Sequence, residues 1–564
     1  MDEVASDHLD RLRTAVLKRY TAGMTAKWIT ENTLYAGQPY SYDDHEYQEE
    51  ILNDTSQESN TQKCSQVGLS EANARKALAR VNMLTPYTVA YTLPTAHFAG
   101  TFTKTRIDPV IEGSKLLRGN IHKTNNNTEV KQFGDSFLWI RGAASSNAPI
   151  SIPCDHLIHD EVDFSDQEVL GQYQSRLTHS KWKIVDRIST PTLPGFGINR
   201  YFQNSRRKYL MAKCHHCNHW FIPDYYKHVK IPGYLDDLRK IDKGTLTRIR
   251  WKEAQVHCPS CGKVPSLQKE HREWVFENPD ENFVAVGHQV SPFDAPNIIL
   301  PSYLVETSTK YDRIQDFENF NLGLPSDDKE ATLTREDFSE LFVRTDVPGG
   351  CVNVMGVDVG NLYHFVIDAV DPWGEVLRVH SEKVPMGMAR TRYHELRREF
   401  RVVCTVMDSG PHSETVMALQ EQDPNMYASV YMRSKSVVTH TVVEKEKVEE
   451  EGQDFVRQVN VNRNKAFDAY MEAIRSNKIH FRDSDLREET IQHHISMKRV
   501  KVFDNDSGEM AYSWQKSDGI DHFHHAGLYG WIAGKIRGVG KPLIVLPTAF
   551  AGRFRVKDKL LLPR

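Results

Sequence analysis

The sequence predicts an α/β protein with two separate sheet-and-helix units, and observations in two distant parts of the chain support this. In the first half, residues 156–161 (HLIHDE) have the pattern of a strand that ends in Asp160-Glu161. In the second half, Asp358, Asp408 and Asp521 each stand at the end of an apolar strand or at the start of a helix. Short β-rich runs alternate with helical segments around both sets, which favours parallel sheets covered by helices.

Composition sets the outer bounds of the prediction. The 564 residues are 39% hydrophobic and 26% charged, enough to bury several cores in three or four domains. The net charge of −4 gives no global attraction to nucleic acid, so any such binding must come from local basic patches. No signal peptide and no apolar run of membrane-spanning length is present, so we expect a soluble, intracellular protein. Eight cysteines are too few for a disulfide scaffold.

The chain divides into six segments by pattern and composition. We expect an N-terminal appendage at 1–45, a first α/β core at 46–204, a basic, aromatic and cysteine-bearing insertion at 205–270, a linker or lid at 271–345, a second α/β unit at 346–540 and a C-terminal tail at 541–564.

A candidate phosphate loop precedes the first long helical stretch of the core. The consensus G-x-x-x-x-G-K-[ST] is absent, and residues 63–71 read KCSQVGLSE instead. Gly68 would let the backbone curl around a phosphate, and the Ser70 hydroxyl could bind Mg²⁺. Leu69 occupies the usual lysine position, so the positive charge must come from Lys63. Taken alone, the segment also fits an ordinary helix N-terminus.

Three neighbouring motifs strengthen the nucleotide interpretation. Upstream, Tyr47 and Gln48 offer an aromatic ring and an amide that could stack on and hydrogen-bond a purine. Downstream, Asp160 would hold Mg²⁺ through water, and Glu161 would polarise the attacking water. Ser189-Thr190 follows another apolar run, at a position where nucleotide-driven motors sense the γ-phosphate. Together these motifs predict a P-loop-type ATPase domain.

The second half has the pattern of a ribonuclease H-like fold. Residues 352–360 (VNVMGVDVG) form an apolar strand that ends at Asp358, and two further strands follow at 365–370 and 376–380. A basic helix at 393–400 then leads to a strand that ends at Asp408. This order of strand, hairpin, helix and strand places two aspartates at adjacent strand ends.

A third carboxylate comes from the start of the last helix. Asp521 precedes that helix, and Asp518 is a rival for the same position. Three converging carboxylates could bind two Mg²⁺ or Mn²⁺ ions about 4 Å apart and so support hydrolysis of a phosphodiester. Each aspartate alone would fit a cap or a turn equally well.

Two C-x-x-C pairs predict a structural zinc site in the insertion. Each short turn presents two thiolates to one tetrahedral ion. The gap between the pairs is longer than in common zinc ribbons, so an inserted segment is expected between them. Basic stretches at 206–208 and 248–252 would contact phosphates or face solvent. The expected ligands are Cys214, Cys217, Cys258 and Cys261, with His215 and His216 as alternatives.

In the order of its motifs, the chain resembles the large terminase subunit of tailed double-stranded DNA bacteriophages, in particular the lambda-like branch. That branch carries a deviant loop with its lysine early, as Lys63 is here. Many terminases also have an arginine inside the loop, where this chain has Ser65 and Gln66. Arg75, Arg106 or a neighbouring subunit would then have to supply any arginine finger. The matching motifs are 47–48, 63–70, 91–95, 160–161 and 189–191.

The resemblance implies an ATP-driven motor that moves double-stranded DNA into a procapsid, with a metal-dependent endonuclease that cuts concatemeric DNA. It implies ATP, Mg²⁺ or Mn²⁺ and Zn²⁺ as ligands, a homo-oligomeric ring, and the host cytoplasm as the location. The appendage would contact the small terminase subunit, and the tail would contact the portal protein. The segment 521–526 (DHFHHA) resembles the lambda-like pattern and favours Asp521 over Asp518.

Two alternatives stay open from the sequence. One is a zinc-containing DNA-binding protein whose degenerate ATPase domain is inactive. The other is a transposase with a ribonuclease H-like core, which would leave Tyr47-Gln48 and Asp160-Glu161 without a role.

Overall fold

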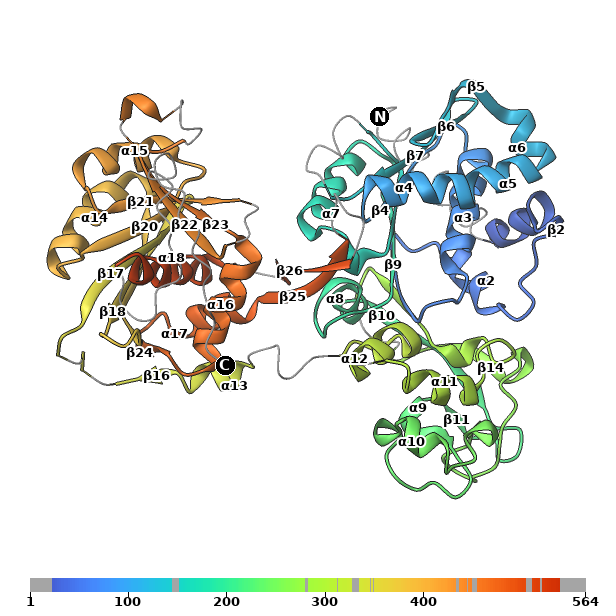
Figure 1. The fold of residues 1–564 in the computed structure, drawn as a ribbon. Coiled ribbons are helices and arrows are strands. Elements are labelled where there is room, and N and C mark those ends of the chain that lie inside the picture. Colours follow the sequence, from blue (N-terminus) through green and yellow to red (C-terminus); the bar gives the residue numbers. More distant parts are fainter. Residues whose placement is uncertain are drawn as a thin grey trace, which may run out of the picture. The chain divides into compact units, whose positions relative to one another are not determined.

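The computed structural model divides into two compact units (Figure 1). The first comprises Met1–Asp328 and Val500–Ala511, and the second comprises Lys329–Arg499 and Tyr512–Arg564. The structure describes residues 23–144, 152–278, 282–311, 313–326, 334–344, 346–347, 349–432, 436–443, 445–448, 454–503, 510–517 and 520–537. Residues 1–22 of the expected appendage, the whole of the expected tail, and Asp518 therefore lie outside the described residues.

A mixed sheet of eleven strands forms the first unit, with parallel strands at its centre. The central strands, in spatial order, are β3 (Glu58–Lys63), β9 (Ile184–Ser189), β8 (His156–Asp160), β4 (Thr88–Leu93) and β7 (Ser136–Gly142). Beyond β7 lie β6 (Val130–Phe133) and β5 (Ile121–Asn126); beyond β3 lie β15 (Val286–Val290), β10 (Arg206–Lys213), β11 (Trp220–Phe221) and β14 (Arg272–Phe276). Because the carboxyl ends of parallel strands share one edge, Lys63, Asp160 and Ser189 are brought to the same side.

Helices pack on this sheet, and short elements fill the insertion. The longest helix, α3 (Leu69–Met83), is buried along most of its length because its small side chains allow close packing. The other helices are α2 (Tyr47–Leu52), α4 (Ala96–Phe102), α5 (Asp108–Gly113), α6 (Lys115–Asn120), α7 (Gln167–Tyr173), α8 (Gly197–Gln203), α11 (Pro301–Ser308) and α12 (Ile314–Phe317). The small hairpin is β1 (Leu34–Tyr35) and β2 (Gln38–Pro39), and the insertion holds α9 (Tyr225–His228), β12 (Val229–Lys230), α10 (Lys243–Leu246) and β13 (Gln255–Val256).

The second unit has a nine-stranded sheet with the order β16-β24-β19-β18-β17-β20-β21-β23-β22. Strand β17 is antiparallel to β18 and parallel to β20. The strands are β16 (Phe342–Val343), β17 (Val352–Asp358), β18 (Leu362–Val370), β19 (Val376–Pro385), β20 (Cys404–Asp408), β21 (Met426–Tyr431), β22 (Val438–Val442), β23 (Arg457–Val461) and β24 (Ile479–Arg482). The strands β25 (Met497–Phe503) and β26 (Met510–Lys516) pair separately.

One helix of this unit crosses the sheet at close range. Helix α18 (His522–Ile536) packs on β17, β18 and β20 (Figure 1). A Cβ at Gly356 of β17 would come within 2.0 Å of the Ala526 carbonyl oxygen, so only glycine allows this approach. The remaining helices are α13 (Arg335–Ser339), α14 (Met386–Glu399), α15 (Ser413–Gln422), α16 (Arg463–Arg475) and α17 (Arg487–Ile495). The expected α/β fold is thus confirmed in both units.

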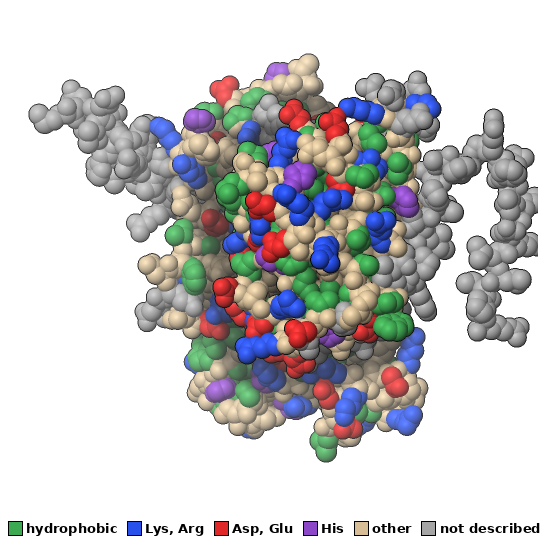
Figure 2. Space-filling model, turned by 90° about the vertical axis from the view of Figure 1, so that its left-hand side faces the viewer, with side chains coloured by type: hydrophobic (Ala, Val, Ile, Leu, Met, Phe, Trp, Pro, Cys, Tyr) green, Lys and Arg blue, Asp and Glu red, His purple; other side chains and the backbone are tan. Residues whose placement is uncertain are grey.

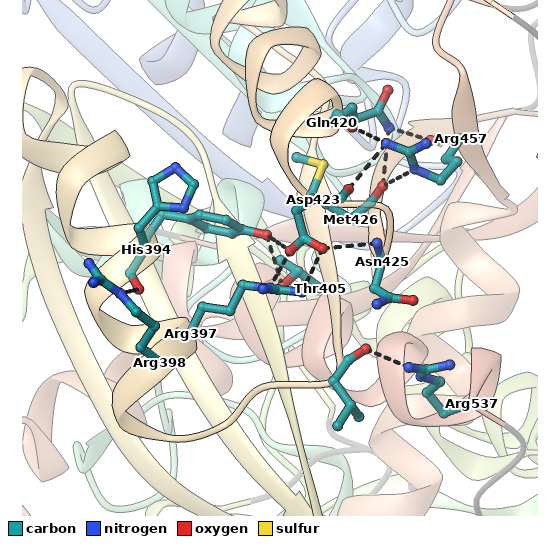
Figure 3. Close-up of polar contacts among 12 residues, drawn as sticks. His394, Arg397, Arg398, Thr405, Gln420, Asp423, Asn425, Met426, Arg457 and Arg537 are labelled. Atoms are coloured by element: carbon teal, nitrogen blue, oxygen red, sulfur yellow. Dashed lines mark hydrogen bonds and ion pairs between the residues drawn. The ribbon is translucent and has the colours of Figure 1, made fainter.

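A polar network around Asp423 fixes α14 against β20 (Figure 3). The Asp423 carboxylate accepts hydrogen bonds from the Tyr393 hydroxyl at 2.6 Å and from the Asn425 backbone N–H at 2.9 Å. Arg397 of α14 forms an ion pair with the same carboxylate. The Tyr393 hydroxyl also forms a hydrogen bond with the Thr405 hydroxyl of β20. The network therefore fixes α14 to β20, the strand that ends at Asp408.

Charge is distributed without an extended single-sign region on the face drawn in Figure 2. Lys and Arg side chains are interspersed with Asp and Glu there, in keeping with the small net charge. Among the described residues, no helix is long and apolar enough to cross a membrane.

Candidate nucleotide site, zinc site and nuclease site

The loop between β3 and α3 has the shape that a phosphate-binding loop needs. Gln66 and Gly68 both have left-handed backbone conformations, with φ of 63° and 69°. A Cβ at Gly68 would meet the Gln48 amide nitrogen at 2.9 Å, so glycine serves both conformation and space. The loop forms one wall of a cavity of about 760 Å³, which Lys63, Ser70 and Glu161 also line. A triphosphate could lie here against the N-terminus of α3.

Lys63 and Glu161 meet in the wall of this cavity, and Asp160 is buried beside them. Lys63 is only 5% exposed, and its Nζ lies 3.2 Å from Glu161 Oε1. Burial alone would lower the pKa of Lys63, but the charges of Glu161 and Asp160 outweigh it and raise the pKa. Burial and the charge of Glu161 raise the pKa of Asp160 to about 6, while hydrogen bonds from Tyr91 and Ser70 oppose that rise. Four predicted residues, Lys63, Ser70, Asp160 and Glu161, are therefore gathered at one place.

Tyr47 and Gln48 hold the loop in place through hydrogen bonds to its backbone. The Tyr47 hydroxyl and the Gln48 amide both donate to the Val67 carbonyl oxygen, at 2.5 and 3.0 Å. Tyr40 in turn donates to Gln48 Oε1 at 2.9 Å. Tyr47 is 3% exposed and does not line the cavity, so the expectation that its ring stacks on a purine does not fit its position.

Other aromatic side chains line the cavity instead. They are Tyr35, Tyr40 and His45, which lie beside Gln48 in its wall. Sequence reasoning missed them because the Gly, Pro and Tyr residues of this segment were assigned to an appendage. The hairpin β1–β2 in fact belongs to the nucleotide cavity.

Ser189 and Thr190 are buried at the end of β9 and are not part of the cavity wall. The Ser189 hydroxyl donates to the Thr190 carbonyl oxygen and accepts from the Asp163 N–H. Asp163, which the sequence did not single out, accepts from the Thr192 and Ile198 backbone N–H groups at 2.7 and 2.6 Å. Burial raises the pKa of Asp163 to about 7 against these hydrogen bonds. Through these hydrogen bonds the Asp163 carboxyl links the segment after β8 to the segment after β9.

The two candidate arginines differ in access. Arg75 is 1% exposed and is engaged by Glu71, Thr33 and the Leu34 carbonyl oxygen, so it cannot reach a nucleotide without breaking buried contacts. The Arg106 side chain is 47% exposed, lines the cavity and pairs with Glu71 at 2.6 Å. Of the two, Arg106 is the one that lines the candidate nucleotide cavity.

The four expected cysteines come together in the insertion. Their sulfur atoms all lie within 4.8 Å of one another; Cys214 and Cys261 are 3.7 Å apart, and Cys217 and Cys258 are 3.6 Å apart. A tetrahedral zinc ion with Zn–S bonds of about 2.3 Å holds its sulfurs about 3.8 Å apart, so the set fits zinc. His215 accepts from the Ser266 N–H, and His216 lies 3.2 Å from the Val264 carbonyl oxygen; neither joins this cysteine cluster.

In the second unit, Asp358 and Asp408 lie at the ends of the adjacent parallel strands β17 and β20. Burial and the charge of Asp358 raise the pKa of Asp408 to about 6. Two carboxylates that repel each other in this way are suited to a divalent cation.

The third expected carboxylate takes a different partner. Asp521 Oδ2 lies 3.3 Å from His525 Nε2, and this pairing lowers the Asp521 pKa although burial opposes it. The α18 residue that reaches Asp358 is His522, with Nδ1 2.7 Å from Asp358 Oδ2. Among the described residues at this end of the sheet, Asp358, His364 and His522 have ligand atoms close enough together to hold one metal ion. Asp521 is not part of this group, and its role as the third carboxylate stays a prediction.

The first unit, with its phosphate loop after β3 and its carboxylate pair at the end of β8, defines a P-loop-type ATPase. The second unit has a ribonuclease H-like sheet with acidic residues at two strand ends. Residues 36–278 match the family described as phage terminase large subunit gpA, ATPase domain. This match covers 243 of the 564 residues and supports the expected phage terminase large subunit through its ATPase domain.

Solved structures of similar proteins include the large terminase of bacteriophage HK97, with 12% identity, a TM-score of 0.44 and coverage of 91% of this chain and 99% of that one. A mutant nuclease domain of the large terminase subunit gp2 of bacterial virus Sf6, solved with manganese and beta-thujaplicinol, has 9% identity, a TM-score of 0.24 and coverage of 36% and 97%. A comparison with curated proteins found no match.

Proposed function

We propose that this terminase subunit couples ATP hydrolysis to the movement of double-stranded DNA into a procapsid and cuts concatemeric DNA with its second unit. The meeting of Lys63, Ser70 and Glu161 in one cavity wall, with Asp160 buried beside them, supports the ATPase step most directly. Double-stranded DNA, the small terminase subunit and the portal protein of the procapsid are its partners, and the working form is a homo-oligomeric ring.

The ion pair between Lys63 and Glu161 suggests how hydrolysis is timed. Without nucleotide, Glu161 is held by the Lys63 ammonium group. Phosphate oxygens carry more negative charge than one carboxylate, so ATP draws Lys63 toward itself. Glu161 is then free to accept a proton from the attacking water. Ser70 and Asp160 would hold a Mg²⁺ ion, which would supply positive charge to the phosphates.

Substitution Glu161→Gln tests this assignment. Nucleotide binding should survive, while hydrolysis should fall by roughly 10²- to 10⁴-fold because general-base catalysis is lost. Glu253→Gln is the matched control, because its side chain is exposed in the insertion. ATPase activity near that of the wild type in Glu161→Gln would refute the role of Glu161 and would favour the DNA-binding alternative with an inactive ATPase domain.

For the nuclease we propose that Asp358 and Asp408 hold divalent cations, Mg²⁺ or Mn²⁺. When bound, such cations stabilise the attacking water and the leaving 3′-oxygen of a phosphodiester. Asp521 lies 3.3 Å from His525 and orients this ring, which lies close enough to Asp408 to act on its pKa. Asp408→Asn should abolish nicking of plasmid DNA, and Asp485→Asn, an exposed aspartate of the same unit, should not. Equal nicking by both variants would refute the proposed nuclease activity of this site.

We also propose that Cys214, Cys217, Cys258 and Cys261 hold a structural zinc ion. The sulfur spacing supports this. The ion would tie the strand pair β10–β11 to the loop after β13. The transposase alternative is disfavoured because it gives no role to the cavity around Lys63.

A further inference from the structure

A cluster of one carboxylate and two imidazoles lies at the carboxyl end of β17. Asp358 comes from β17, His364 from β18 and His522 from the start of α18, and one ligand atom of each lies within 4.8 Å of the others. Asp358 and His364 are direct partners across the antiparallel pair β17–β18, so their side chains stand on the same face of the sheet. Three different elements therefore converge on one point.

His364 is buried, and one of its two ring nitrogens is unpaired among the described residues. It is 3% exposed, and its Nδ1 has no hydrogen-bond partner. A buried polar nitrogen without a partner is costly, and such groups call for a specific reason. The His364 ring stacks on the His522 ring, with centroids 4.5 Å apart and planes at 21°. This places a second imidazole directly beside the first.

The neighbouring His493 provides a contrast. Its Nδ1 accepts a hydrogen bond from the Phe523 N–H at 3.1 Å, and its Nε2 lies 3.7 Å from Glu489. Both of its nitrogens thus have structural partners. His364, with an unpaired nitrogen, differs from it in the way expected for a ligand.

We propose that Asp358, His364 and His522 bind a divalent first-row transition-metal cation such as Mn²⁺ through two nitrogens and one oxygen. Mg²⁺ prefers oxygen ligands, whereas imidazole suits transition metals. The inference extends the proposed nuclease function, because Asp358 belongs to both sites. Asp358 then contributes to two cation sites. At one site it is joined by Asp408, so the protein ligands are oxygen atoms only. At the other it is joined by the two histidines, which supply nitrogen ligands. This second site makes the enzyme favour Mn²⁺ over Mg²⁺.

The test is to measure Mn²⁺ binding to the full-length, nucleotide-free protein. Calorimetry gives the affinity and the number of bound ions, and pulsed electron paramagnetic resonance reports on the atoms bound to Mn²⁺. The resonance experiment detects nitrogen atoms bound to Mn²⁺. Ser70 and Asp160 of the nucleotide site offer only oxygen, so they contribute no such signal. The wild type should show the nitrogen signal. His364→Ala should weaken Mn²⁺ binding by roughly 10- to 100-fold or remove one bound equivalent, and the double variant with His522→Ala should lose the nitrogen signal.

Two further variants keep the test decisive. His440→Ala removes a half-buried histidine from β22, at the far edge of the same sheet, and should bind Mn²⁺ like the wild type. His364→Asn keeps a buried polar side chain with an oxygen ligand, so it should retain a cation but lose the preference for Mn²⁺ over Mg²⁺. Wild-type affinity and an unchanged nitrogen signal in the double variant would overturn the proposal. A nitrogen signal in a wild-type protein that does not cut DNA would uphold it and refute the nuclease function instead.

Discussion

Gly356 of β17 offers a sharp test of how the nuclease site is built. A Cβ added there would lie 2.0 Å from the Ala526 carbonyl oxygen and 2.2 Å from the Gly530 nitrogen, both backbone atoms of α18. Gly356→Ala must therefore push β17 and α18 apart by roughly an ångström. Overpacking of this kind costs about 1–3 kcal/mol. For a unit of this size, that lowers the melting temperature by roughly 2–12 °C.

The same displacement should impair cleavage. Asp358 and His522 lie on the two elements that separate, and a misplacement of about 1 Å can cost about 100-fold in rate. Plasmid nicking, ATPase activity and thermal unfolding are measured on the same preparation. Gly360→Ala is the control, because its added Cβ would meet only the Leu362 carbonyl oxygen at 3.5 Å. Gly356→Ala protein with the stability and nicking rate of Gly360→Ala would refute the close packing of β17 against α18.

Three further predictions concern the first unit. Purified protein should contain about one equivalent of zinc, which Cys258→Ser loses with a drop in stability and Cys351→Ser retains; a folded, zinc-free wild type would contradict this. Lys63→Ala should weaken ATP binding by roughly 10- to 100-fold, because a charged hydrogen bond is lost, and unchanged binding in a nucleotide titration would exclude the early lysine. The pKa of Asp160 is raised to about 6, so its carboxyl takes up a proton as pH falls through that value. Mg²⁺ affinity should therefore decrease from pH 7 to pH 5 in the wild type and stay flat in Asp160→Asn.

The sequence could place Lys63 and Asp160 close together because each of them ends a strand of the first sheet. Lys63 and Asp160 end strands that run parallel, and parallel strand ends must share an edge. The apolar run expected before Ser189-Thr190 is β9, whose last residue is Ser189 itself. Asp163 could not be found in this way, because its partners Thr192 and Ile198 follow a different strand.

The nuclease site was harder to predict, because its residues meet through strand register. The second strand was expected to begin at residue 365, but β18 begins at Leu362. This difference moves His364 from a turn to the position opposite Asp358. The sequence placed Asp521 at the start of α18, as the structure does. Which side chain of α18 points to Asp358 depends on the rotation of the helix about its axis, and the sequence does not give that rotation. That rotation is set by the glycine contacts of α18 with the sheet.

We propose that this chain carries two separate active sites, and parallel assays of Glu161→Gln and Asp358→Asn distinguish them. ATP hydrolysis and metal-dependent plasmid cleavage are measured for both variants and the wild type. The account predicts that Glu161→Gln loses hydrolysis and still cuts DNA, whereas Asp358→Asn hydrolyses ATP and no longer cuts, since a neutral amide cannot balance the cation charge. Cleavage that survives Asp358→Asn, or loss of both activities in either folded variant, would contradict it.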